Sequence, residues 1–240
     1  MIQVVKVANR DEGNVKAHEI LQTIIDQEKI LVLSGGTSPD YRKMIVEPAL
    51  KDFDRTQGYG VQAGDFLPGA ICVADERYGL PYHEHSNELL LKEQGIEEFV
   101  EKKKIEYHKI LNGKGFDITA REYELIINQL FSNFKKKVGV MGIGNNLHTA
   151  GIFPHSKAVS TSSQVVGEIV NDDYPRRITL SLRALDDSQY FVILAFGPEK
   201  KEALLKVLDE NENDMISYPA VFYRKCFAKA FLITDVDLTG

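Results

Sequence analysis

KKVGVMGIGNNLHTAGIFPHS, residues 136–156, contains an apolar run that passes directly into a glycine-rich turn. A short apolar run bounded by glycines is typical of a buried β-strand that ends at the turn. The turn carries His148, preceded by Asn145 and Asn146. An imidazole at the end of a buried strand raises the question of its chemical role. A second question is why two asparagine amides, and no carboxylate, stand beside it.

The same pattern recurs along the chain, where short apolar runs alternate with helical patterns. Strands are expected over residues 4–7, 30–33, 70–74, 138–143, 178–182, 190–196 and 230–234. Helices are expected over residues 14–27, after Pro39, and over residues 86–94, 118–134 and 198–208. This alternation predicts an α/β sandwich around a mostly parallel sheet with helices on both faces. In such a sheet the loops at the carboxyl ends of the strands form the site.

The composition limits the functional classes. Of the 240 residues, 43% are hydrophobic and 27% are charged, as in an ordinary globular protein. We expect residues 1–240 to form a single domain, because no stretch rich in Pro, Gly and Ser resembles a linker. The net charge of −6 argues against broad electrostatic binding to nucleic acid or anionic lipid.

The two cysteines indicate the compartment. Cys72 and Cys226 are too few for a disulfide framework or a cysteine-based zinc cluster. The N-terminus lacks a signal-peptide core, and no apolar run approaches the ~18 residues needed to span a membrane. We therefore expect a cytoplasmic monomer or small homo-oligomer with reduced thiols and no membrane partner.

The first candidate loop is LVLSGGTSPDYRKM, in which an expected strand ends at Leu33. Glycines let backbone N–H groups approach an anion, hydroxyls add donors, and a helix beginning at Pro39 adds partial positive charge, so the loop suits a phosphate. A tight turn that caps the helix explains the same residues equally well. The loop lacks the lysine of a Walker motif and the glycine spacing of a dinucleotide fingerprint. Its candidate phosphate-binding residues are Ser34, Gly35, Gly36, Thr37 and Ser38.

The second candidate loop opens with Asp75, Glu76 and Arg77 at the carboxyl end of an apolar strand. Three consecutive charges are costly to bury unless they are paired or used, which favours a functional site over a solvated loop. Arg77 suits a phosphate or carboxylate, because its planar fork donates two hydrogen bonds. His83 and His85 form a His-Glu-His pair, but no further ligand cluster is evident, so we expect no metal.

Two more loops supply positive charge. Arg176 and Arg177 precede an expected strand, and Lys200 and Lys201 stand near the start of a helix. A lysine in the first turn of a helix opposes the helix dipole, so it is either solvated or present for an anion. Each of these residues alone is more consistent with a surface charge. Their place in a set of site loops favours anion binding.

Five motifs in order resemble the 6-phosphogluconolactonase family, which shares a superfamily with glucosamine-6-phosphate deaminase. The motifs cover nearly the whole chain: SGGTSP, DER followed by Ser86-Asn87, MGIG…HTAGIFP, RRITLSL and FGPEKKEALL. The resemblance implies a Rossmann-like fold of the NagB/RpiA/CoA transferase-like type. It further implies hydrolysis of 6-phospho-D-glucono-1,5-lactone to 6-phosphogluconate in the pentose phosphate pathway, without metal or organic cofactor.

The resemblance also assigns roles to residues. It implies that Arg77, Arg177, Lys200 and the loop from Ser34 to Ser38 hold the phosphate of a small phosphosugar, and that His148 activates water. The chemistry is reasonable in itself, because histidine is the side chain whose ordinary pKa lies near neutrality. Water activated by the base attacks C1, backbone N–H groups stabilise the oxyanion, and the distant phosphate positions the ring. The candidate catalytic residues are His148, Asp75 and Asn146.

The histidine loop departs from the family pattern GxDGHTASLFP at three positions. Asn146 replaces an aspartate, Leu147 a glycine and Gly151 a serine. Asparagine keeps an acceptor for the histidine but loses the charge that would raise its pKa. A leucine at a site that requires positive φ costs roughly 1–2 kcal/mol. His85 also stands where the family has an aspartate.

Three hypotheses follow. The chain is a 6-phosphogluconolactonase, or a related phosphosugar hydrolase, isomerase or deaminase, or a sugar-phosphate-binding homologue with weak or no activity. Deaminases have a TGSTP loop, DEY, and a glutamate five positions after the active-site histidine. This chain has SGGTSP, Arg77 and Phe153 at those sites, which favours the lactonase.

Overall fold

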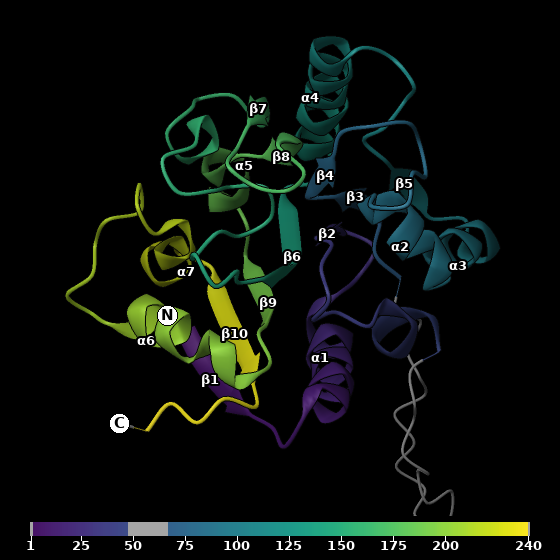
Figure 1. The fold of residues 1–240 in the computed structure, drawn as a ribbon. Coiled ribbons are helices and arrows are strands. Elements are labelled where there is room, and N and C mark those ends of the chain that lie inside the picture. Colours follow the sequence, from purple (N-terminus) through teal and green to yellow (C-terminus); the bar gives the residue numbers. More distant parts are fainter. Residues whose placement is uncertain (1, 48–66, 240) are drawn as a thin grey trace, which may run out of the picture.

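The computed structural model describes residues 2–47 and 67–239, and its main sheet is wholly parallel within them. The seven strands lie in the order β1-β10-β9-β6-β2-β3-β5, and every neighbouring pair is parallel (Figure 1). They are β1 (Ile2–Lys6), β2 (Lys29–Leu33), β3 (Ala70–Val73), β5 (Glu106–His108), β6 (Lys136–Gly142), β9 (Tyr190–Leu194) and β10 (Lys229–Thr234). The predicted α/β architecture around a mostly parallel sheet is confirmed.

A second sheet of three antiparallel strands was not expected. It consists of β4 (Asp75–Arg77), β8 (Arg176–Leu180) and β7 (Val165–Ile169), in the order β4-β8-β7. The strand expected over residues 178–182 therefore lies outside the parallel sheet and ends earlier. It stops because Ser181 caps the following helix, its side chain accepting a hydrogen bond from the backbone N–H of Ala184.

The helices expected from periodicity are present, with one correction. The expected helix after Pro39 is a π-helical segment, Arg42–Val46, and residues 48–66 lie outside the described part of the chain. Helices α3, α5 and α7 were not predicted. The helices are α1 (Arg10–Ile24), α2 (Asn87–Glu93), α3 (Ile96–Lys103), α4 (Phe116–Asn133), α5 (Leu182–Asp186), α6 (Lys201–Leu208) and α7 (Phe222–Lys225).

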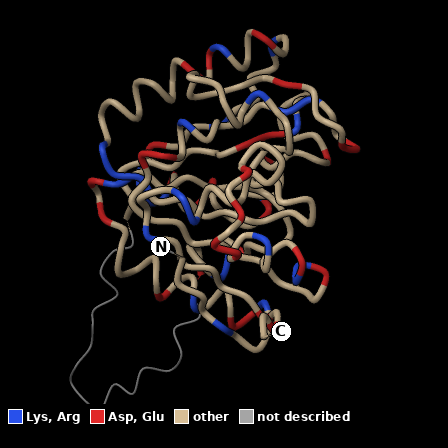
Figure 2. Tube along the Cα trace, turned by 90° about the vertical axis from the view of Figure 1, so that its left-hand side faces the viewer, with Lys and Arg blue, Asp and Glu red and all other residues tan. Residues whose placement is uncertain are grey.

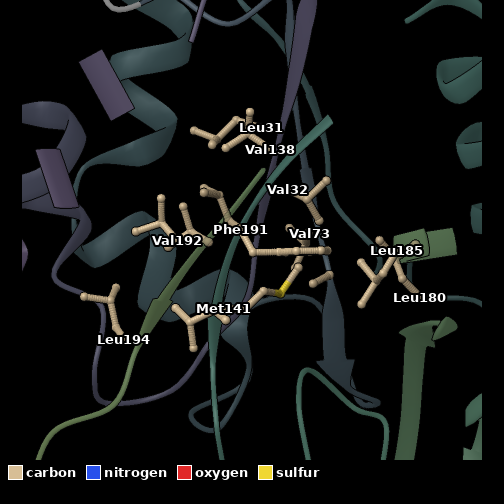
Figure 3. Packing of buried hydrophobic residues seen from close by; sticks show 14 of the residues in the cluster. Leu31, Val32, Val73, Val138, Met141, Leu180, Leu185, Phe191, Val192 and Leu194 are labelled. Atoms are coloured by element: carbon tan, nitrogen blue, oxygen red, sulfur yellow. The ribbon is translucent and has the colours of Figure 1, made fainter. Parts of the chain in front are cut away.

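The core forms where the central strands carry apolar side chains on both faces. In β2, Ile30 to Leu33 are buried almost completely, as expected of a parallel strand covered on both sides. Phe191 of β9 belongs to the same buried cluster as side chains of β2, β3 and β6 (Figure 3), and its ring meets those of Phe222 and Tyr223 edge-on. Gly139 of β6 leaves the necessary space, because a Cβ there would lie 2.7 Å from the Phe191 ring.

The strand order places the site. From β2 the chain adds β3 and β5 on one side, and β6 then pairs with the other side of β2. The loops that leave the carboxyl ends of β2 and β6 therefore diverge, and this is where parallel α/β sheets hold ligands. The loop after β9 lies next to them, because β9 pairs with β6.

The surface charges do not form a single basic face. Figure 2 shows the Lys and Arg residues interspersed with Asp and Glu along the trace, in keeping with the net charge of −6. Among the helices of the described ranges, none has both the length and the apolar character needed to cross a bilayer.

Candidate active site

A cavity of about 520 Å³ lies at this edge of the sheet. It is lined by residues from the loops after β2, β3, β6 and β9 and by the start of β8. The structure brings together all eleven residues expected from the sequence, namely Ser34, Gly35, Gly36, Thr37, Ser38, Asp75, Arg77, Asn146, His148, Arg177 and Lys200. Their proximity makes a common site possible, and their roles remain predictions.

His148 is held by Asn146. The backbone N–H of His148 donates to Oδ1 of Asn146 at 3.2 Å, which identifies this atom as the amide oxygen. The same oxygen lies 2.5 Å from Nδ1 of the His148 ring, so Nδ1 carries the proton and donates it to Oδ1. Nε2 is thereby left with its lone pair. Asparagine thus fixes the tautomer that a base requires, without adding a negative charge.

The environment of His148 keeps its ring neutral. Burial, followed by the positive charges of Arg177 and Lys200, lowers the pKa of His148 from 6.5 to about 4. The ring of Phe153 stacks on the imidazole, with centroids 4.5 Å apart and planes 10° from parallel. The pKa of His148 therefore lies below the ordinary value of histidine, which is near neutrality. At pH 7 the imidazole has a free lone pair but is a weaker base than an exposed histidine.

The turn before His148 is tightly closed. Gly144 donates its backbone N–H to the carbonyl of His148 at 2.9 Å, and Leu147 donates to the carbonyl of Gly144 at 2.9 Å. A Cβ on Gly144 would lie 2.2 Å from the imidazole ring. The glycine is therefore required for the ring to pack over the turn.

Hydrogen bonds from a neighbouring helix position the end of the loop from Ser34 to Ser38. Asn14 of α1 donates to the carbonyl of Ser38 at 3.3 Å and accepts from the backbone N–H of Asp40 at 2.7 Å. Among the described residues, none accepts a hydrogen bond from the backbone N–H of Gly36, Thr37 or Ser38. These donors suit an anion. Within the described residues, the helical segment that follows the loop is Arg42–Val46, which is too short to supply the full dipole of a long helix.

Asn87 joins this loop to the second one. Its side chain lies against Gly35, where a Cβ would come within 1.9 Å of Oδ1. Its amide group donates to the carbonyl of Asp75 at 2.7 Å and accepts from Nη1 of Arg77 at 3.0 Å. Asn87 therefore orients Arg77 relative to the loop from Ser34 to Ser38, and with Asn87 in this position only glycine fits at position 35.

The three charged residues from Asp75 to Arg77 have different positions: two line the cavity, and one is buried beneath it in the fold. Asp75 lines the cavity, and burial raises its pKa, although Arg77 and Arg177 act in the opposite direction. Glu76 is fully buried and accepts the backbone N–H groups of Arg77, Asn87 and Glu88. It therefore ties β4 to the start of α2. Glu76 is the member of the run that is used for structure.

The cationic side of the cavity has unused donors. Nε of Arg77 and Nε of Arg177 are buried and have no hydrogen-bond partner among the described residues. Lys200 donates to the carbonyl of Ile143 at 2.8 Å, and burial lowers its pKa. An unpaired buried N–H costs about 1–3 kcal/mol, so both arginines favour an anionic ligand.

Comparison with known proteins identifies the family. Residues 14–230 match the sequence profile of the glucosamine-6-phosphate isomerases/6-phosphogluconolactonase family. The chain belongs to this family. It is 26% identical to a 6-phosphogluconolactonase of Nostoc sp. over 84% of this chain and 81% of the relative. It is 24% identical to a glucosamine-6-phosphate deaminase of Enterococcus faecalis, over 87% of each chain.

A solved structure agrees with the fold. The 6-phosphogluconolactonase of Leishmania guyanensis superposes with a TM-score of 0.74 and 22% identity, over 98% of this chain and 96% of that one. At this identity the likeness concerns the fold alone. Relatives of both kinds are similarly distant in sequence, so the side chains of the cavity must separate the activities within the glucosamine-6-phosphate isomerase/6-phosphogluconolactonase family.

Two departures from the family pattern have structural explanations. Leu147 has a φ of 61°, so the left-handed conformation expected of a glycine site is present and the leucine adopts it. Gly151 donates its backbone N–H to Oγ1 of Thr179 at 3.1 Å, and a Cβ there would lie 2.7 Å from the Thr179 side chain. A serine at position 151 would require β8 to shift.

Leu147→Gly is expected to lower the free energy of unfolding by about 1–3 kcal/mol. The relief of left-handed strain is worth about 1–2 kcal/mol, whereas removing a buried leucine side chain costs about 2–5 kcal/mol. Leu147 is only 8% exposed, so the second effect dominates. Ala150 has a φ of 49° and only a partly buried methyl group to lose, so Ala150→Gly is expected to stabilise by up to ~1 kcal/mol. Urea unfolding gives the change in the free energy of unfolding for each variant. If Leu147→Gly were stabilising, the relief of strain would outweigh the lost burial, contrary to our expectation.

Sequence patterns missed several residues at the cavity. Asp172 and Asn171 line it from the turn between β7 and β8, and Phe153 stacks on His148. The signal for Asp172 was the acidic pair in NDDYPRR, five residues before Arg177, which a hairpin brings together. Asn87 was noted only as part of a motif, since nothing in the sequence shows its contact with Gly35.

His83 and His85 contact residues close to the cavity and do not line it. Nε2 of His83 lies 2.8 Å from the carbonyl of Arg77, and the His85 ring lies 4.5 Å from that of Tyr174. Within residues 2–47 and 67–239, no three His, Cys, Asp or Glu side chains form a group suited to a metal ion.

Proposed function

We propose that the chain is a single 6-phosphogluconolactonase-like domain that hydrolyses 6-phospho-D-glucono-1,5-lactone to 6-phosphogluconate. The observation that carries this proposal is the pairing, in one cavity, of a neutral histidine whose Nε2 has a free lone pair with two arginines whose Nε atoms are unpaired. The first group is suited to removing a proton from water. The second is suited to a phosphate.

The reaction proceeds through a tetrahedral intermediate. The lone pair on Nε2 of His148 takes a proton from water, and the water oxygen forms a bond to C1 of the lactone. The carbonyl electrons move to its oxygen, and they return as the bond between C1 and the ring oxygen breaks. The proton passes from the imidazolium to the departing oxygen, which leaves a carboxylic acid that then ionises. Water is the only co-reactant.

Backbone N–H groups supply the oxyanion donors. Asn145 and Asn146 line the cavity, and their N–H groups have no acceptor among the described residues. Such donors stabilise charge without reorganising during the reaction. Asp75 faces the same cavity. Its carboxylate is a strong hydrogen-bond acceptor, so it orients the sugar by accepting hydrogen bonds from the sugar hydroxyl groups.

Phosphate binding makes the base stronger. The charges of Arg177 and Lys200 lower the pKa of His148 in the absence of ligand. A phosphate dianion held by Arg77, Arg177, Lys200 and the loop from Ser34 to Ser38 offsets those charges, so the pKa of His148 rises when substrate is bound. The binding energy of the remote phosphate is thereby used at the reacting centre.

Deamination of an amino sugar phosphate is the main alternative. Deaminases of the superfamily carry a glutamate where this chain has Phe153. Here the phenyl ring packs flat on His148, and no carboxylate takes part in a dyad with the imidazole at that position. Aldose–ketose isomerisation needs an acid and a base to move protons between carbons. The stacked Phe153 therefore favours hydrolysis.

The test compares the two reactions on the full chain. We expect lactone hydrolysis well above the spontaneous rate and no ammonia release from glucosamine 6-phosphate. Hydrolysis no faster than background would refute catalysis and would leave a binding protein. In that case 6-phosphogluconate at about 100 times its dissociation constant should still stabilise the fold by ~2.7 kcal/mol, which thermal unfolding measures.

A further inference from the structure

The two arginines of the cavity face each other across a strand pair. β4 and β8 are antiparallel, and Arg77 is the register partner of Arg177. Like charges directly opposite each other in a sheet repel, and here both side chains point into one cavity. An anion near both side chains therefore stabilises this pairing.

Asp172 supplies an anion from the chain itself. Its carboxylate pairs with Nη2 of Arg177 from the turn between β7 and β8. The Arg177 side chain is 5% exposed and that of Asp172 is 31% exposed, so the acidic partner lies on the solvent side of the pair. Nη2 and Nε form one edge of the guanidinium group. Asp172 takes only the first of these donors, and Nε has no partner among the described residues.

The same turn contacts the other arginine. The guanidinium carbon of Arg77 lies 5.9 Å from the centre of the Tyr174 ring, which also contacts His85. One turn therefore contacts both arginines: Asp172 pairs with Arg177, and the Tyr174 ring lies against Arg77. A ligand that approaches Arg177 from the cavity meets Asp172 as a competitor for Nη2.

We propose that Asp172 is a specificity-determining residue, which occupies one donor of Arg177 and admits only ligands able to take the whole Nε and Nη2 edge. This inference rests on the proposed function, because the ligand in question is the substrate phosphate. A phosphate dianion presents two oxygens to the edge and displaces a single carboxylate contact. A carboxylate or other weak monoanion gains too little to do so, and its negative charge is repelled by Asp172.

The test measures binding and needs no turnover. Dissociation constants for inorganic phosphate, 6-phosphogluconate and gluconate are measured by calorimetry on the full chain and on Asp172→Asn. We expect Asp172→Asn to bind the two phosphate ligands on the order of tenfold more tightly, since a partly exposed ion pair no longer competes. Gluconate, which lacks the phosphate, is expected to gain by a larger factor through its carboxylate at Arg177, so that selectivity for phosphate falls, and an equal or smaller gain would overturn the proposal.

Asp173→Asn is the matched control. It removes the same charge from the adjacent, exposed residue, which does not line the cavity. We expect less than about a twofold change in phosphate binding, as for a screened surface charge. Equal effects of the two substitutions would show that only net charge matters and would overturn the proposal.

The remaining outcomes are also decisive. Weaker phosphate binding by Asp172→Asn, or no phosphate binding by either form, overturns the proposal, because Asp172 would then support Arg177 or the arginines would not bind phosphate. Tighter binding by Asp172→Asn together with no lactone hydrolysis by the wild-type chain would sustain the proposal and refute the catalytic function. The two conclusions are therefore separable.

Discussion

His148→Ala is expected to slow lactone hydrolysis by about a hundredfold or more, the usual contribution of a positioned base. The loss should appear in kcat, because the phosphate contacts that position the substrate remain. His155→Ala is the matched control, since His155 is exposed and does not line the cavity. The measurement is the rate above spontaneous hydrolysis for both variants. Equal rates for His148→Ala and the wild type would assign the base to another group.

The pH profile gives a sharper form of this prediction. In the proposed mechanism the neutral form of His148 is the base, so activity should be retained above its pKa and lost as the pH falls through it. For the free protein, kcat/KM should fall only near pH 4, because the pKa of His148 is lowered to about 4. The fall in kcat should lie at higher pH, since bound phosphate offsets the charges of Arg177 and Lys200. Coincident profiles would contradict the coupling between the phosphate and the base.

Asn146→Asp tests the departure in the histidine loop. An aspartate at the same position accepts the Nδ1 proton and adds a negative charge, which raises the pKa of His148. We expect the acidic limb of kcat/KM to move to higher pH and the rate at pH 7 to increase if base strength limits turnover. An unchanged limb in Asn146→Asp would mean that the residue does not act on His148.

Arg77→Met is expected to raise KM for the phosphorylated lactone by about 30-fold or more. Removing one member of a buried, hydrogen-bonded charge pair costs about 2–5 kcal/mol, and each 1.4 kcal/mol is a factor of ten. Methionine keeps the apolar stem, so the change is mainly one of charge. Steady-state kinetics with the phosphorylated and unphosphorylated lactones measure the effect, which should be confined to the former.

Two further variants complete the arginine experiment. Arg77→Lys keeps the charge but loses the planar fork, and an intermediate KM is expected. Arg183→Met removes an exposed arginine that pairs with Asp187 away from the cavity, and its kinetics should match those of the wild type. If Arg77→Met impaired both lactones equally, Arg77 would support the cavity instead of binding phosphate.

The parallel sheet could be predicted because its strands are simple in sequence. A strand such as β2 is covered on both faces, so it is a continuous apolar run that short-range patterns reveal. β4 and β5 are three residues each, and β7 mixes Val165 and Val166 with Gly167 and Glu168. Their pairing depends on contacts between distant parts of the chain. The antiparallel sheet was therefore missed, although it carries both arginines.

The site could be predicted as a set of loops but not as a set of contacts. The carboxyl edge of a parallel sheet gathers its loops whatever their sequence, so the eleven expected residues meet in one cavity. The stacking of Phe153 on His148 and the insertion of Asn87 beside Gly35 depend on tertiary packing, which no local pattern encodes. The low pKa of His148 follows from the same packing.

The pairing of Arg77 with Arg177 would link the proposed phosphate binding to the register of β4 and β8. A slip of β4 by one residue against β8 would turn Arg77 to the opposite face, and only the native pairing would keep both arginines at the proposed phosphate site. A ligand that binds one pairing alone increases its population by mass action. A phosphosugar bound at this site would therefore favour the native register of β4 and β8. Amide hydrogen exchange in β4 and β8 should slow on adding 6-phosphogluconate, more than in the central parallel strands.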